Sequence, residues 1–143
     1  MPHWVTLAFD EYAKRMPAHM PLSLIEIKPE NRNSGKSIPQ MLSLEKERIL
    51  TNLPSRCKMI ALDEKGENLD TLQFVSRLKI WIEDDVTFII GGADGLDPEL
   101  KKKSNLQLRL SSLTLPHAIA RVVLAEQLYR AVSILQNHPY HRS

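Results

Sequence analysis

An almost continuous apolar run, Val86–Ile90, ends directly at a pair of glycines. A strand whose neighbouring side chains are nearly all apolar is buried on both faces, which is typical of parallel sheets covered by helices. Two more short apolar runs, Leu22–Ile27 and Lys58–Leu62, are further strand candidates. Leucines alternate with polar residues over 106–110, and residues 110–117 form another candidate strand. These runs predict a sheet of several buried strands.

Helical patterns separate these strands. Asp70 stands where it can cap a helix, and Pro98 can open a short helix through Lys103. The alternation predicts an α/β fold with a mostly parallel sheet flanked by helices. At 143 residues the chain is expected to form one domain, residues 1–143. The helical candidates are 4–16, 38–53, 70–82, 98–103 and 118–136.

The composition is that of a soluble globular protein, with 43% apolar and 25% charged residues. No apolar run is long enough to span a bilayer, and the N-terminus lacks a signal-peptide pattern. A cytoplasmic location without membrane contact is therefore expected. The single cysteine, Cys57, has no partner for an internal disulfide and is interpreted as a small core residue.

The net charge of +2 is too small to indicate a nucleic-acid binder by itself. The positive excess lies in residues 116–143, where three arginines accompany the single acid Glu126. This distribution suits a phosphate-bearing partner, and it suits an ordinary solvated tail equally well. For the run Lys101-Lys102-Lys103, a solvated helix face is favoured over an RNA contact.

The last helical candidate, residues 118–136, is apolar around much of its circumference. Such a helix needs two surfaces to cover it. One is expected to be the sheet of its own chain, and the other a second copy of the protein. Within this helix, Glu126 is placed to pair with Arg130 four residues later.

Two of the strand candidates end in small or hydroxyl-bearing residues. Gly91 and Gly92 carry no side chains, so a ligand can approach their backbone closely. Ser111, Ser112 and Thr114 offer hydroxyl groups. Because ligands bind beyond the carboxyl ends of strands in open parallel sheets, this edge is the expected ligand site. A plain edge strand or turn is the alternative interpretation of the serine-rich run.

Four segments closely resemble one known family. They are residues 91–96 (Gly-Gly-Ala-Asp-Gly-Leu), 113–117 (Leu-Thr-Leu-Pro-His), 124–131 (Leu-Ala-Glu-Gln-Leu-Tyr-Arg-Ala) and 137–142 (Asn-His-Pro-Tyr-His-Arg). Trp4 and residues 10–12, 25–27 and 62–63 also fall where that family has similar residues. On these motifs, the chain resembles the ribosomal RNA large-subunit methyltransferase H (RlmH) family of the SPOUT superfamily. The resemblance covers essentially the whole chain.

The resemblance implies a SPOUT-type domain with a C-terminal trefoil knot. It implies that S-adenosylmethionine is used to methylate a pseudouridine of 23S rRNA on the imide nitrogen at ring position three. It also implies that the protein acts as a homodimer on the assembled ribosome. Family members begin with an apolar strand ahead of the position matching Met1, so the resemblance implies that the family's first strand is missing here.

The family's pattern places the cofactor among three loops. The glycine backbone can reach the adenine and ribose, and leucine side chains can enclose the adenine. The cofactor-binding residues implied by the resemblance are Leu62, Gly91, Leu110, Ser111, Ser112, Leu113, Thr114 and Leu115.

The C-terminal residues are the candidate catalytic groups. The imide nitrogen must lose its proton to become a good nucleophile, and a nearby cation or base assists this loss. Arg142 is a permanent cation, His141 can titrate near neutral pH, and Tyr140 can stack on a base or bind its edge. A frayed end is the alternative for this tail. A metal site built from His138, His141 and His117 is disfavoured because neither cysteine nor carboxylate lies nearby in sequence.

Two other functions remain open at this point. One is a non-catalytic RNA- or ribosome-binding module that retains the fold but has lost turnover. The other is a methyltransferase that acts at a different RNA position.

Overall fold

The computed structural model describes residues 1–142 and contains a three-stranded parallel sheet. The strands are β1 (Cys57–Asn68), β2 (Asp85–Ile89) and β3 (Leu106–Arg109), in the order β2-β1-β3. Cys57 is in register with Asp85, and Ile60 with Leu106. The predicted α/β fold with a parallel sheet is therefore confirmed, and the β2 and β1 strands begin within one residue of their predicted starts.

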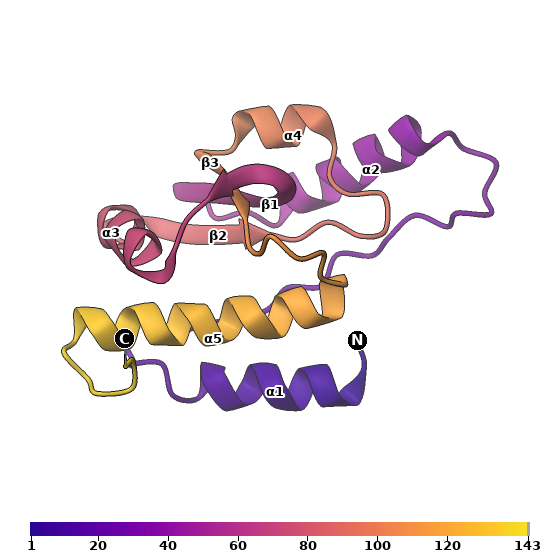
Figure 1. Cartoon of the computed structure of the whole chain (residues 1–143). Coiled ribbons are helices and arrows are strands. Elements are labelled where there is room, and N and C mark those ends of the chain that lie inside the picture. Colours follow the sequence, from indigo (N-terminus) through magenta and orange to yellow (C-terminus); the bar gives the residue numbers. More distant parts are fainter. Residues whose placement is uncertain (143) are drawn as a thin grey trace.

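Helices cover both faces of this sheet (Figure 1). The short α4 (Pro98–Lys103) and α2 (Ile38–Thr51) lie on one side. The other side carries α5 (His117–Leu135), with α3 (Thr71–Trp81) against it and α1 (His3–Ala13) outside it. All five predicted helices are present.

The core has two parts, one on each face of the sheet. The larger lies between the sheet, α3 and α5 and includes Ile60, Phe74 and Leu128. The smaller lies toward α2 and α4 and includes Ala61, Ile89 and Leu100. Because neighbouring residues of β1 and β2 contribute to opposite clusters, these strands must be apolar on both faces, as their sequences indicated.

The capping signals in the sequence mark two helix starts. The Asp70 carboxylate accepts a hydrogen bond from the backbone N–H of Gln73, whose side chain accepts one from the backbone of Asp70. Ser37 and Gln40 form the same reciprocal arrangement at the start of α2. Each arrangement satisfies two main-chain donors at a helix end, where no intrahelical partner exists.

Strand β1 is interrupted by a bulge. Leu62 and Glu67 both pair with Leu108 of β3, so residues 63–66 project out of the ladder. Lys101 of α4 holds this bulge through an ion pair of 3.3 Å with Asp63. Pairing resumes at Glu67, directly after Gly66, where a Cβ atom would lie 2.6 Å from the carbonyl oxygen of Gln107. A side chain at this position is therefore sterically excluded.

We expect Gly66→Ala to lower the free energy of unfolding by about 1–3 kcal/mol, because backbone atoms of β3 must move to admit the methyl group. Urea denaturation measures this change. The matched control is Gly92→Ala, since a Cβ at Gly92 has no atom within 4 Å and its φ is not positive. Equal losses in the two variants would contradict this steric explanation.

Two strand predictions were wrong. Residues 22–27 are extended but form no strand, because no partner strand lies alongside them in the described part of the chain. The predicted strand at 110–117 is a loop followed by the first residue of α5. This loop bends back on Arg109, whose guanidinium donates to the carbonyl oxygens of Ser111 and Ser112. Those contacts replace the ladder that a strand would need.

The covering of α5 also differs from expectation. Its second apolar face packs against α1 of the same chain, and α1 contributes the buried side chains of Val5 and Phe9. A second copy of the protein is therefore not needed to cover that face. Over residues 1–142, no helix combines the length and apolarity required to cross a membrane.

Candidate functional site

Three of the predicted ligand-binding segments lie at one edge of the sheet. Leu62 is the last paired residue of β1 before its bulge, Gly91 comes two residues after β2 ends, and Leu110 follows β3 directly. Because the three strands are parallel, their carboxyl ends point the same way. This placement agrees with the edge at which open parallel sheets bind ligands.

The glycine loop after β2 is a tight turn. The N–H of Gly95 donates to the carbonyl oxygen of Gly92 at 3.1 Å, and Gly95 has a φ of +77°. A Cβ on Gly91 would lie 2.6 Å from the backbone carbon of Gly95, whereas one on Gly92 would meet open space. The turn thus requires glycine at Gly91 and Gly95, while the backbone of Gly92 stays accessible to a ligand.

An ion-pair chain fixes this turn to α2. Asp94 at its tip pairs with Arg32 at 2.8 Å, and Arg32 pairs with Glu45 at 3.0 Å. The Glu45 carboxylate accepts a hydrogen bond from Arg32, and this contact raises the pKa of the Arg32 guanidinium, which remains charged. Sequence reasoning missed Arg32, which lies between the predicted strand at 22–27 and the predicted helix at 38–53.

The loop after β3 is also organised locally. The hydroxyl of Ser111 accepts a hydrogen bond of 2.9 Å from the N–H of Leu113. The side chain of Leu113 is 77% exposed, and those of Ser112 and Thr114 are exposed as well. The loop therefore presents an unburied apolar side chain and two hydroxyl groups at the predicted cofactor edge. Sequence reasoning also missed Arg109, which holds the backbone of this loop.

Two cavities near this edge each contain only one of the eight predicted cofactor residues. Gly91 lines a large groove of about 1370 Å³, and Leu110 lines a small cavity of about 330 Å³ beside α3. The remaining six, which line neither space, are Leu62, Ser111, Ser112, Leu113, Thr114 and Leu115. These two cavities therefore do not gather the predicted cofactor residues around one space.

The C-terminal tail turns back along α5. Asn137 has a φ of +58°, its N–H donates to the carbonyl of Ile134, and the N–H of His138 donates to that of Ser133 at 2.8 Å. These two bonds form the Schellman arrangement that ends many helices. The tail is consequently directed back over the last turns of α5 and is not a frayed end.

The reversed tail forms an aromatic and charged cluster with α1 and α5. Tyr140 packs edge-to-face on Tyr129 with ring centroids 4.7 Å apart, and the Arg130 guanidinium lies 4.9 Å from the Tyr140 ring centroid. The predicted ion pair of Arg130 with Glu126 is present at 2.6 Å. Burial raises the pKa of the Tyr140 phenol above its ordinary value of 10.0, so this phenol is neutral at pH 7. Tyr140 is therefore a hydrogen-bonding group and not an anion.

His141 is held by the same cluster. Its Nδ1 lies 2.9 Å from Nη1 of Arg130. Because a guanidinium only donates, Nδ1 must accept, which leaves the ring proton on Nε2. In this arrangement His141 offers a donor and no free basic nitrogen. Arg142 is exposed and forms no ion pair within residues 1–142.

Within one chain, the predicted cofactor loops and the predicted catalytic tail are far apart. The cofactor-edge loop leads directly into His117 at the start of α5, whereas His141 contacts Arg130, thirteen residues further along that helix. At 1.5 Å per residue, this spacing is about 20 Å. Reacting atoms must approach to about 3–3.5 Å. One chain therefore does not bring Tyr140, His141 and Arg142 to the cofactor loops, nor His117 to His138.

A parallel α/β sheet with a glycine turn and a hydroxyl-bearing loop beyond its strand ends defines a class of proteins that bind small molecules at that edge. The family model described as "Predicted SPOUT methyltransferase" matches residues 1–141, and the chain belongs to this family of methyltransferases. The resemblance seen in the sequence motifs is thereby confirmed.

Curated relatives agree with this assignment. The chain is 54% identical over 144 residues to a protein of Paraburkholderia phymatum, covering 99% of this chain and 92% of that protein. It is 54% identical over 145 residues to one of Burkholderia multivorans, covering 100% of this chain and 93% of the relative. A third relative, from Burkholderia thailandensis, is 52% identical over 145 residues. All three are named ribosomal RNA large subunit methyltransferase H.

Proposed function

We propose that the protein methylates a pseudouridine of 23S rRNA on the imide nitrogen of ring position three, with S-adenosylmethionine as donor. The observation that carries this proposal is 54% identity, over nearly the full length of both chains, to a protein named for ribosomal RNA methylation. The substrate is the assembled ribosome, which places the protein in the cytoplasm, and the domain of residues 1–143 carries the C-terminal trefoil knot typical of SPOUT proteins.

The cofactor edge fits an adenosyl group. Gly92 leaves open space beside its backbone, and the exposed Leu113 can cover an adenine ring. Leu62, Leu110 and Leu115 add apolar surface, while Ser111, Ser112 and Thr114 supply polar groups at the rim. When bound there, S-adenosylmethionine supplies an electrophilic methyl group attached to a sulfonium.

The tail supplies the groups that act on the RNA base. Arg142 is exposed and permanently charged, so it stabilises the anion formed when the imide nitrogen loses its proton. Tyr140, neutral and partly exposed, positions the base by hydrogen bonding or ring contact. His141, whose Nδ1 is engaged by Arg130, donates through Nε2 to a base oxygen.

The separation of the cofactor loops and the tail along α5 supports a homodimer. Two copies with their α5 helices antiparallel bring the tail of each chain to the cofactor loops of the other. Apolar surface is available for such contact, because Trp4 and Leu7 on α1 are 51% and 57% exposed. These residues are three apart and so lie on the same side of the helix.

Two measurements test the proposed function. Calorimetric titration of the protein with S-adenosylmethionine is expected to show saturable binding below millimolar concentration. Mass mapping of 23S rRNA from a deletion strain is expected to show one pseudouridine lacking its methyl group, which purified protein restores on isolated ribosomes. Absence of heat at millimolar cofactor would favour a non-catalytic RNA- or ribosome-binding module. Binding with an unchanged pseudouridine would indicate a methyltransferase for another position.

A further inference from the structure

The glycine turn after β2 is held from outside by one polar side chain. Within the turn, the N–H of Gly95 donates to the carbonyl oxygen of Gly92. The carboxylate of Asp94, at its tip, pairs with Arg32 at 2.8 Å. Among residues 1–142, no other side chain forms a hydrogen bond or an ion pair with residues 91–95. The contact with Arg32 is therefore the one that fixes the tip.

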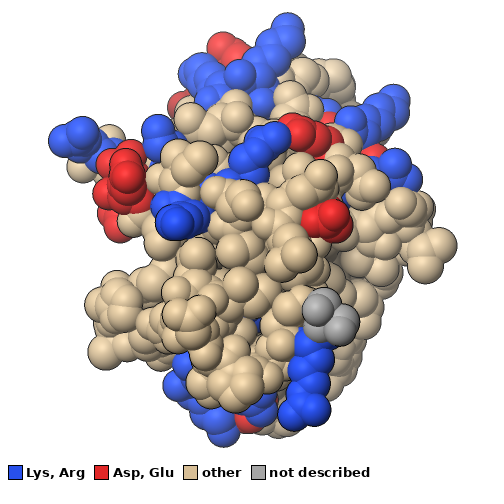
Figure 2. Space-filling model, turned by 60° about the vertical axis from the view of Figure 1, so that its left-hand side comes forward, with Lys and Arg blue, Asp and Glu red and all other residues tan. Residues whose placement is uncertain are grey.

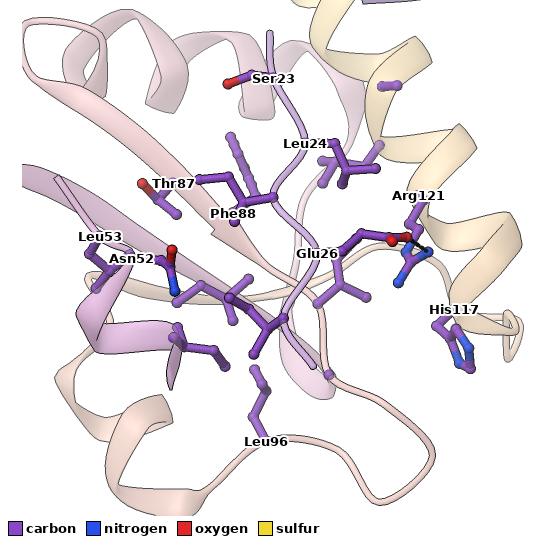
Figure 3. A pocket seen from close by; sticks show the side chains of 18 of the residues that line it. Ser23, Leu24, Glu26, Asn52, Leu53, Thr87, Phe88, Leu96, His117 and Arg121 are labelled. Carbon is purple, nitrogen blue, oxygen red and sulfur yellow. Dashed lines mark hydrogen bonds and ion pairs between the residues drawn. The ribbon is translucent and has the colours of Figure 1, made fainter. Parts of the chain in front are cut away.

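The two ends of the turn are anchored in the core. Ile89 and Leu96 are buried, and Leu96 lines the groove shown in Figure 3. Both belong to the smaller core cluster, against which Ile49 and Leu50 of α2 pack. The stretch between these ends contains three glycines, the residue type with the greatest freedom in the unfolded chain. The conformation of the tip consequently depends on the contact of Asp94.

Arg32 binds several acceptors at once. Its Nη1 donates to a carboxylate oxygen of Glu45 at 3.0 Å and to the carbonyl oxygen of Glu30 at 3.3 Å. Its Nη2 donates to the second carboxylate oxygen of Glu45 at 3.5 Å, and its Nε lies 2.8 Å from Asp94. One planar guanidinium thus joins a carboxylate of α2 to a carboxylate of the turn, a geometry that the point charge of a lysine does not reproduce.

The connection that carries Arg32 is itself bound along α2. The backbone N–H of Glu30 donates to Glu45 at 2.8 Å, and the Glu30 carboxylate pairs with Arg48 at 3.0 Å. Arg48 also donates to the carbonyl oxygen of Lys28 at 2.8 Å. On the face shown in Figure 2, basic and acidic side chains adjoin one another in the upper layer, above a broad uncharged band. Arg32 is therefore fixed relative to α2 and supports the turn from there.

We propose that Arg32 is a positioning residue for the cofactor, because it holds Asp94 and thereby keeps the glycine turn in the conformation that receives the adenosyl group. The inference rests on the proposed function and adds a residue to its site. In this conformation, the backbone of Gly92 faces open space. A turn that is already held loses less conformational freedom when the ligand binds, which raises the affinity. Arg109 holds the loop after β3 in a comparable way.

Calorimetric titration with S-adenosylmethionine tests this role in a double-mutant cycle. The side chains of Arg32 and Asp94 are 33% and 29% exposed, so we expect Arg32→Ala and Asp94→Ala each to weaken binding about fivefold. The double variant is also expected to lose about fivefold and not about 25-fold, because both changes remove the same contact. Arg32→Lys keeps the charge without the planar fork and is expected to lose less affinity than Arg32→Ala.

Lys58→Ala is the matched control. Lys58 pairs with Asp84 at 3.8 Å at the amino-terminal ends of β1 and β2, opposite the cofactor edge, and its side chain is 37% exposed. We expect this variant to bind the cofactor like the wild type. Kinetics separate positioning from catalysis, since Arg32 does not reach the reacting atoms. In Arg32→Ala, the KM for the cofactor should rise about fivefold, while kcat stays within about twofold of wild type.

Amide hydrogen exchange reports on the turn without any cofactor. The N–H of Gly95 is protected by its bond to Gly92, and this bond weakens when the tip moves freely. We expect exchange at Gly95 to become about fivefold faster in Arg32→Ala and in Asp94→Ala. Exchange at Ile60, in the core of β1, should not change, which shows that the fold is intact.

The outcomes separate this role from the proposed function. Unchanged affinity in Arg32→Ala, losses that multiply in the double variant, an equal loss in Lys58→Ala, or a lower kcat with unchanged KM would each reject the positioning role alone. Absence of binding by the wild type would reject the proposed function and, with it, the cofactor role of Arg32. Unchanged exchange at Gly95 in Arg32→Ala would show in either case that Arg32 does not hold the turn.

Discussion

Replacing Arg142 by alanine is expected to lower kcat for ribosome methylation about 100- to 1000-fold while leaving the Kd for S-adenosylmethionine nearly unchanged. The reason is that Arg142 is an exposed cation on the tail, about 20 Å along α5 from the cofactor loops of its own chain. Its proposed contact is with the anionic base and not with the cofactor. Single-turnover methylation and calorimetry measure the two quantities separately.

Arg142→Lys and Arg56→Ala are the companion variants. Lysine keeps the charge but loses the planar donor fork, so we expect partial activity. Arg56 is also exposed, lies between α2 and β1, and its replacement is expected to leave both quantities unchanged. Equal losses of turnover and cofactor affinity in Arg142→Ala would place Arg142 at the cofactor and reject its assigned role.

Local signals in the sequence predicted most of the regular structure. The run Val86–Ile90 corresponds to β2, and Asp70 caps α3 with the side-chain geometry expected of a capping residue. Such features depend on residues within one turn or one strand of each other, which is why periodicity reveals them. Strand β1 is a partial case, because its first part at 58–62 was predicted but its bulge after Leu62 and its continuation to Asn68 were not.

Features that depend on distant partners were not predictable in this way. Residues 22–27 have the composition of a strand, but a strand also needs a neighbour, and their main-chain groups have none within residues 1–142. Residues 110–116 form a loop, although the sequence analysis predicts a strand there. Its conformation is determined by the Arg109 side chain, whose direction no local pattern encodes.

The candidate site, too, was predicted only where it depends on residues close together in the sequence. Gly91 and Leu110 were correctly expected beyond the ends of β2 and β3, because residues that follow parallel strands share an edge. The environment of the tail was not expected. Tyr140 packs on Tyr129, and the ring centroids of Tyr129 and Tyr12 of α1 are 6.4 Å apart. The three tyrosines thus join residues from both ends of the chain.

Mixing two inactive variants is expected to restore about a quarter of the wild-type activity. One variant carries Gly91→Val, which disrupts the cofactor loop because a Cβ there would lie 2.6 Å from the backbone of Gly95. The other carries Arg142→Ala. Random pairing makes half of the dimers mixed, and each mixed dimer combines one intact loop with the intact tail of its partner. One site in four is then complete, although neither variant alone contains any.

The recovery distinguishes sites shared between chains from sites within one chain, because the latter stay defective in every mixture. Activity is measured after the variants are unfolded and refolded together, and separately refolded samples mixed afterwards give the baseline. Leu113→Asp replaces Gly91→Val in a second pair, since the exposed Leu113 side chain can change without disturbing the core. If neither pair recovers activity although mixed dimers are present, the tail acts on the loops of its own chain. Methyl transfer would then require the tail to leave Tyr129 and Arg130 and cross about 20 Å of α5.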